Sequence, residues 1–129
     1  MNMNQTNLKK SANSNTPNSS LDKIELSDPI VMVHSGKDAD TSLKLIDSYG
    51  NPIKNAPIKA VYDKDNGILL KHNHKLWDND CSILTDENGM IFYHIIYDCK
   101  KTLSGTVQEI KFSDNKLTEA IQQIFIQEK

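Results

Sequence analysis

The sequence predicts an all-β protein, an antiparallel β-sandwich of about seven to nine short strands. Three observations carry this prediction. Tight turns that combine an acidic residue with a glycine occur at residues 47–50 and 86–89. Apolar, aromatic and β-branched runs follow both turns, which is how antiparallel strands are punctuated. Turn signals then recur about every ten residues, the spacing that is typical of a sandwich.

The strands are predicted from the alternation of apolar and polar residues and from the turn residues that flank each run. Pro29 cannot donate to a ladder, so it suits an edge or a kink between two half-strands. The stretch 90–97 is the most hydrophobic and is predicted to be a central strand, apolar on both faces. The expected strands are residues 23–26, 30–33, 41–46, 57–62, 68–70, 82–85, 90–97 and 105–112.

The last segment, residues 117–126, is open between helix and strand. Leu117, Ile121, Ile124 and Phe125 fit helical spacing. The ending Ile124-Phe125-Ile126 is strand-like, and a sandwich needs a closing strand. We favour the strand, because tertiary context overrides weak propensity.

Two units are expected along the 129 residues. Residues 1–21 are predicted to be a disordered tail, since the first twenty hold six Asn, four Ser and two Thr. Residues 22–129 form the sandwich domain, which is long enough to bury a core without disulfides.

Composition argues against several classes of partner. The net charge of -2 supplies no field for nucleic acid or an anionic membrane. All 15 basic residues are Lys, whereas Arg is preferred for bidentate phosphate and base-edge contacts. No run approaches the roughly 20 apolar residues that span a bilayer, so no membrane insertion is expected. No signal peptide is visible at the N-terminus.

The two cysteines are expected to be unpaired. If strands 82–85 and 90–97 formed a hairpin, Cys81 would face roughly His94, and Cys99 would lie about five residues, or ~16 Å, further along. A disulfide needs Cα atoms within about 7 Å.

The order of the motifs resembles the bacterial immunoglobulin-like domains of the invasin and intimin type, the Big-1 family. Asp47-Ser48-Tyr49-Gly50-Asn51-Pro52-Ile53 matches its first turn motif, and Thr85-Asp86-Glu87-Asn88-Gly89 matches its second. Gly67-Ile68-Leu69 lies where a G-x-L element belongs. The carboxypeptidase regulatory-like domain is a second, weaker resemblance, because its two motifs usually lie closer together.

The resemblance implies an immunoglobulin-like fold and a non-catalytic role at the bacterial cell surface. The expected function is a structural spacer, or adhesion and protein binding, in a surface-exposed bacterial or phage-related protein. A protein or glycan partner would be bound through end loops. Big-1 domains usually occur in tandem behind a membrane anchor, and neither a repeat nor an anchor is visible in this sequence.

The motif residues have structural roles that need no ligand. Gly50 and Gly89 are expected to have positive φ, and Pro52 pre-sets φ for the next strand. Asp47 and Asp86 are expected to accept hydrogen bonds from backbone N–H groups two or three residues on, closing each turn locally.

The segment 72–81 is the one place with metal-like residue types. His72 and His74 would share one face of a strand, with Asp78, Asp80 and Cys81 nearby. The spacing matches no strong zinc signature, so no metal or other cofactor is expected. A ligand- or metal-binding accessory protein that uses this loop is the alternative function.

Trp77 and His94 complete the candidates. Trp77 either plugs the sandwich beneath the loop or, with His72 and His74, contacts a partner. His94 lies in the most apolar stretch and is expected to be a packed or edge histidine rather than a general base. No catalytic motif is readable, so no enzymatic activity is expected.

Overall fold

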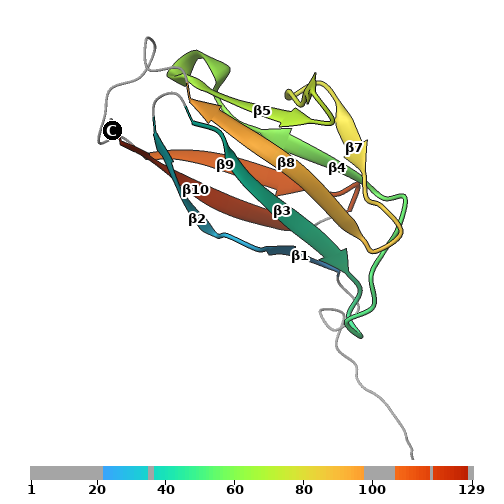
Figure 1. The fold of residues 1–129 in the computed structure, drawn as a ribbon. Coiled ribbons are helices and arrows are strands. Elements are labelled where there is room, and N and C mark those ends of the chain that lie inside the picture. Colours follow the sequence, from blue (N-terminus) through green and yellow to red (C-terminus); the bar gives the residue numbers. More distant parts are fainter. Residues whose placement is uncertain (1–21, 35–36, 98–106, 117, 128–129) are drawn as a thin grey trace, which may run out of the picture.

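The structure is a computed structural model that describes residues 22–34, 37–97, 107–116 and 118–127. These residues form two packed five-stranded β-sheets (Figure 1). The strands are β1 (Lys23–Leu26), β2 (Ile30–His34), β3 (Ala39–Ile46), β4 (Pro57–Val61), β5 (Ile68–His72), β6 (Lys75–Leu76), β7 (Ser82–Leu84), β8 (Met90–Tyr97), β9 (Val107–Ser113) and β10 (Glu119–Gln127). A short 3₁₀ turn, η2 (Lys64–Asn66), precedes β5.

The described strands number ten, which exceeds the predicted seven to nine. The additional strand is β6, which has two residues. So short a strand shows no alternation, and it forms because the chain folds back on the end of β5. The expectation for residues 117–126 is confirmed as a strand, β10. The predicted tail, residues 1–21, lies outside the described residues.

The first sheet has the order β1-β3-β8-β5-β6 and the second the order β2-β10-β9-β4-β7. All neighbouring pairs are antiparallel except β2 and β10, which run parallel. The central place of residues 90–97 is confirmed, since β8 is the third of five strands. Its inner residues are buried, whereas Phe92 on the outer face is exposed.

The expected hairpin of residues 82–85 with 90–97 is wrong. Strand β7 pairs with β4 in the second sheet, while β8 lies in the first. The turn at 86–89 therefore carries the chain between sheets. A turn motif fixes a local reversal but not the sheet that the next strand joins. Cys99 lies outside the described residues, so the unpaired state of the two cysteines remains a prediction.

The N-terminal segment also divides between the sheets, at the predicted kink. Strand β1 pairs with β3, and after Pro29 β2 pairs with β10. Hydrogen bonds of polar side chains link the segment between β1 and β2 to β3 and β10. The Ser27 hydroxyl donates to the Ser42 carbonyl at 2.7 Å, and the Gln122 amide donates to the Asp28 carbonyl at 2.7 Å. Buried Tyr93 donates in turn to the Gln122 side-chain oxygen at 2.7 Å.

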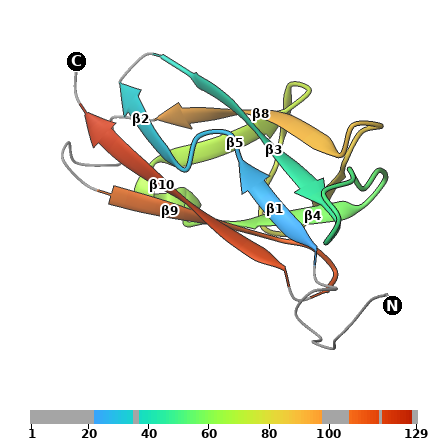
Figure 2. The same ribbon diagram turned by 90° about the horizontal axis from the view of Figure 1, so that it is seen from below.

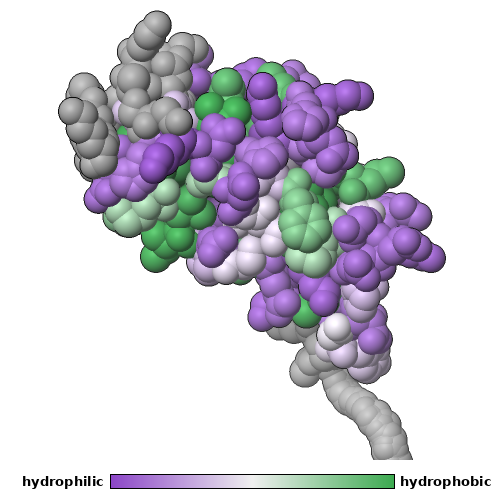
Figure 3. All heavy atoms as spheres, in the orientation of Figure 1, coloured by the Kyte–Doolittle hydropathy of each residue, from purple (hydrophilic) through white to green (hydrophobic). Residues whose placement is uncertain are grey.

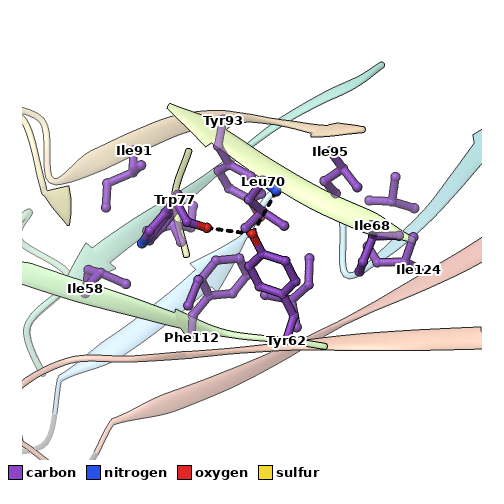
Figure 4. Close-up of a cluster of buried hydrophobic side chains, with 14 of the residues drawn as sticks. Ile58, Tyr62, Ile68, Leu70, Trp77, Ile91, Tyr93, Ile95, Phe112 and Ile124 are labelled. Carbon is purple, nitrogen blue, oxygen red and sulfur yellow. Dashed lines mark hydrogen bonds between the residues drawn. The ribbon is translucent and has the colours of Figure 1, made fainter. Parts of the chain in front are cut away.

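The core lies between the sheets and is built from the inward positions of both (Figure 4). Three rings form its centre. Trp77 meets Tyr93 edge-on with ring centroids 5.6 Å apart, and Phe112 lies 5.5 Å from Trp77 and 5.3 Å from Tyr93. Such tilted arrangements are favourable for aromatic rings beyond their buried area.

The two ends of the described chain lie at opposite ends of the sandwich (Figures 1 and 2). Strand β1 starts beside the turns at 47–51 and 86–90, and β10 ends at the far end.

Candidate functional site

The two sequence motifs come together at one end of the sandwich. The N–H of Leu45 donates to the Gly89 carbonyl at 2.8 Å, and the N–H of Ile53 donates to the Leu45 carbonyl at 3.0 Å. Residues about forty positions apart thus form one backbone network. The approach is so close that a Cβ at Gly89 would lie 2.7 Å from the Leu45 oxygen and 3.0 Å from the Pro52 side chain.

Both expected glycine conformations are confirmed. Gly50 has φ of 88° and Gly89 has φ of 72°, a region that L side chains rarely adopt. Space around the two differs, because nothing lies within 4 Å of a Cβ at Gly50. Pro52 bridges antiparallel to Ile46 and so ends the turn.

The two aspartates close their turns in the same way. Asp47 Oδ1 accepts from the N–H groups of Tyr49 and Asn51, both at 2.9 Å. Asp86 Oδ1 accepts from the N–H groups of Asn88 at 2.8 Å and Met90 at 2.9 Å. The hydrogen bond from Asn51 is the main cause that lowers the pKa of Asp47 below its ordinary value. Both aspartates accept from position i+2, as expected, whereas their second donor lies at i+4 rather than i+3.

A third turn of this design lies beside them. Asp114 Oδ1 accepts from the N–H groups of Lys116 at 2.8 Å and Thr118 at 3.2 Å, joining β9 to β10. The sequence indicates a turn at residues 113–115, but this turn has no glycine, and the sequence does not mark Asp114 as its acceptor. The recurring signal is an aspartate whose carboxylate reaches positions i+2 and i+4.

The segment 72–81 differs from its expectation. His72 ends β5, and Asn73 and His74 form the turn to β6 with φ of 51° and 67°. The two histidines therefore do not share a strand face, because the chain reverses between them. The His72 ring is held locally: its Nδ1 lies 2.9 Å from the Phe92 carbonyl and its Nε2 lies 3.2 Å from the Asn73 amide.

Trp77 lies inside the core and is 0 % exposed. This matches the interpretation of Trp77 as a plug beneath the loop, and it corrects the expectation that Trp77 contacts a partner, because a buried ring offers no surface. Tyr62 fixes the segment: its hydroxyl donates to the Trp77 carbonyl at 2.7 Å and accepts from the Leu70 N–H at 3.1 Å (Figure 4). Burial raises the pKa of Tyr62.

Metal-ligating side chains do not converge in the described part of the chain, where no group of three or more His, Cys, Asp or Glu could hold an ion. His94 is half-buried on the outer face of β8 and pairs with Asp40 of β3.

A groove of about 570 Å³ lies along β1, between Leu26, Met90 and Ala120. None of its lining residues belongs to the segment 72–81, so the groove gives the ligand-binding alternative no support.

The second sheet exposes an apolar outer face that the sequence analysis did not single out. Met32, Phe125 and Val107 occupy adjacent register positions on β2, β10 and β9. Figure 3 shows hydrophobic side chains gathered at the edge where β2 and β10 lie in Figure 1. Seven of the ten exposed large hydrophobic side chains of the described residues belong to this sheet: Ile30, Met32, Val61, Leu84, Val107, Ile121 and Phe125.

Comparison with known proteins gives a likeness of fold. No protein-family model matches the sequence, and no curated protein matches it significantly. Domains 4 and 5 of the S-layer protein SbsC match with a TM-score of 0.60 at 12% identity, covering 93% of this chain and 55% of that one. The Yersinia pseudotuberculosis adhesin InvE matches with a TM-score of 0.58 at 5% identity, covering 94% and 34%.

A conjugative transposon lipoprotein from Bacteroides eggerthii matches over nearly its whole length. Its TM-score is 0.53 at 13% identity, and the match covers 80% of this chain and 95% of that one. The chain spans about half or less of the S-layer and adhesin chains. No helix among the described residues is long and apolar enough to cross a membrane.

Proposed function

We propose that this chain is a non-catalytic, immunoglobulin-like module of a surface-exposed bacterial or phage-related protein, and that it acts as a structural spacer or presents a binding surface. One observation carries the proposal: the chain enters the sandwich at one end and leaves at the other (Figures 1 and 2). A domain built in this way holds whatever precedes and follows it a sandwich length apart.

The interlocked turns support the same function. Three aspartate turns close the end at which the described chain enters, and the Thr118 hydroxyl ties the chain there by donating to the Asp22 carbonyl at 3.1 Å. The resemblance to Big-1 motifs and the likeness in fold to S-layer, adhesin and lipoprotein chains favour a surface location.

Partner contacts are proposed on the exposed loops, where recognition residues are commonly carried by a rigid scaffold. Two exposed turns remain after Trp77 is set aside. His72 and His74 lie at the β5–β6 turn, and Tyr49 is 88 % exposed at the tip of the turn at 47–51.

Labelling of intact cells tests the location. An antibody raised against the domain should stain unpermeabilised cells of the source organism, or intact phage particles. Staining that needs permeabilised cells would contradict the proposal.

A pull-down from the same surface fraction tests the contacts. His74→Ala and Tyr49→Ala are each compared with the wild-type chain, with Met32→Lys as the sheet-face control. Loss of a partner with a loop variant supports the loops. Loss with Met32→Lys alone would show that the strands carry recognition.

Calorimetry with zinc tests the alternative function. A one-to-one zinc site that His74→Ala abolishes would favour that alternative.

A further inference from the structure

The described sheets end in four edge strands, β1, β6, β2 and β7, and three of these carry features that discourage pairing with another molecule. An edge strand leaves backbone N–H and C=O groups open to a further strand, and short length or charge on the edge opposes this. Strands β6 and β7 have only two and three residues. Strand β1 exposes Lys23 and Glu25, whose side chains form an ion pair at 3.8 Å.

Strand β2 has neither kind of protection. It runs over five residues, IVMVH, and none of them is Lys, Asp, Glu or Pro. Its outward side chains are apolar, since Ile30 is 59 % exposed and Met32 is 47 % exposed. An uncharged, apolar edge strand of ordinary length is a place where a further strand adds to a sheet.

The backbone of β2 is oriented for such an addition. The N–H of Gln123 donates to the Pro29 carbonyl at 2.9 Å, in the register that sets Gln123 opposite Ile30. Because the direction of the backbone groups alternates along a strand, Val31 faces β10. Ile30 and Met32 therefore turn their N–H and C=O groups to the open side of the sheet.

We propose that β2 pairs antiparallel with β2 of a second copy of this chain, about a two-fold axis at Val31. Ile30 of each copy then lies opposite Met32 of the other, and the outward backbone groups of these residues meet across the join. The interface is closed, because a two-fold axis uses the same strand on both copies.

Polar residues complement each other at both ends of this join. Asp28 of one copy lies opposite His34 of the other, so a carboxylate faces an imidazole twice. Asp28 is exposed, and its Oδ2 accepts from the Thr41 hydroxyl at 2.8 Å, which holds the carboxylate beside the strand. Moving the axis by one residue in either direction would set an apolar side chain opposite Asp28 or His34. The sequence of the edge therefore favours the register centred on Val31.

Pairing also extends the apolar surface of the second sheet. Met32, Phe125 and Val107 form one row across β2, β10 and β9, and the register adds Ile30 of the other copy to the end of that row. Figure 3 shows hydrophobic side chains gathered at this edge. The contact involves few backbone bonds and few side chains, so we expect a weak pair, with a dissociation constant of about 10 µM to 1 mM.

This inference goes beyond the loop contacts proposed above and does not depend on where the protein is located. Two copies related by the axis run in opposite directions. Under the proposed surface location, such a pair joins chains that come from two facing surfaces. Failure of the pairing would leave the location untouched, because purified protein tests the first and labelling of cells tests the second.

Sedimentation equilibrium of the full chain in reducing buffer, at about 10 µM to 1 mM, tests the pairing. The wild-type chain should show a monomer–dimer equilibrium. A basic variant carries Ile30→Lys with Met32→Lys, and an acidic variant carries Ile30→Glu with Met32→Glu. Each variant alone sets like charges opposite each other, which should raise the dissociation constant at least about ten-fold.

An equimolar mixture of the two variants sets Lys opposite Glu and should restore the dimer, which also shows that both variants fold. Val107→Lys is the control on the same outer face, two strands from the edge, and should change the dissociation constant less than about two-fold. A wild-type chain that stays monomeric up to about 1 mM would overturn the pairing and leave the edge to a strand of a different protein. Dissociation by Val107→Lys, without rescue in the mixture, would show that the copies stack face to face and would equally overturn it.

Discussion

Each of the three aspartates at the entry end of the sandwich uses one carboxylate oxygen to collect two backbone N–H groups. Such local hydrogen bonds close a turn before any strand pairs, so a single residue specifies a reversal of the chain. At position 89 a glycine is also required by a distant part of the chain, because the backbone of Leu45 and Ile53 occupies the space where a side chain would lie.

The two motif glycines should tolerate substitution unequally. Gly50→Ala should lower the free energy of unfolding by about 1–2 kcal/mol, the cost of positive φ for an L side chain. Gly89→Ala carries the same cost and places a Cβ 2.7 Å from the Leu45 carbonyl oxygen, which adds about 1–3 kcal/mol of overpacking. Chemical denaturation measures both. Equal losses would contradict the close approach of the two turns.

Asp47 should contribute to the acid sensitivity of the domain. Its pKa is held below the ordinary 3.8, mainly because the Asn51 N–H donates to the ionised carboxylate. This stabilisation is fully present above 3.8 and is lost as the pH falls through the lower folded-state pKa. Asp47→Asn keeps an acceptor oxygen but does not titrate, so its melting temperature should fall less on acidification to about pH 2. Circular dichroism over the acid range measures this, and an identical fall in both proteins would contradict it.

At the scale of elements, the segment 72–81 is not an open loop, because hydrogen bonds to Tyr62 anchor it to the core. Tyr62 binds it with its hydroxyl and with its backbone, since its N–H donates to the Asn79 side-chain oxygen and its carbonyl accepts from the Asn79 amide, both at 3.1 Å. Trp77 then fills the core between the sheets.

Removing the Tyr62 hydroxyl should weaken this anchor. Tyr62→Phe leaves the Trp77 carbonyl and the Leu70 N–H without their partner in the interior, which should cost about 1–3 kcal/mol of unfolding free energy. Tyr49→Phe is the control at an exposed position and should change stability by less than about 0.5 kcal/mol. Urea unfolding of the two variants compares them. A Tyr62→Phe loss as small as that of the control would contradict the anchor.

The elements show what local sequence can and cannot specify. The turns at 47–50 and 86–89, the kink at Pro29 and the central strand 90–97 follow from residue types within a few positions, and the structure confirms them. The sheet that β7 joins depends on pairing with distant β4, which no local pattern encodes. Alternation along a strand predicts His72 and His74 on one face. The structure instead has a turn there, which depends on positive φ at the non-glycine residues Asn73 and His74.

At the scale of the whole molecule, two sheets are joined by a chain that changes sheet at Pro29 and again at the turn 86–89. The first change brings the N-terminal segment beside the C-terminal strand and makes the parallel pair. The proposed spacer function depends on that pairing, because it aligns the two chain ends with the long axis of the sandwich.

Cross-linking across this pair tests the account most directly. Met32 and Phe125 occupy one register position of the parallel ladder, and both are exposed. Met32→Cys with Phe125→Cys, in a background with both native cysteines replaced by Ala, should form an intramolecular disulfide on mild oxidation, because neighbouring strands bring Cα atoms within about 7 Å. The control pair Met32→Cys with Ile121→Cys is offset by four residues, or ~13 Å, and should keep its thiols. A disulfide in the control, or two free thiols in the register pair, would contradict the parallel pairing of the first and last strands.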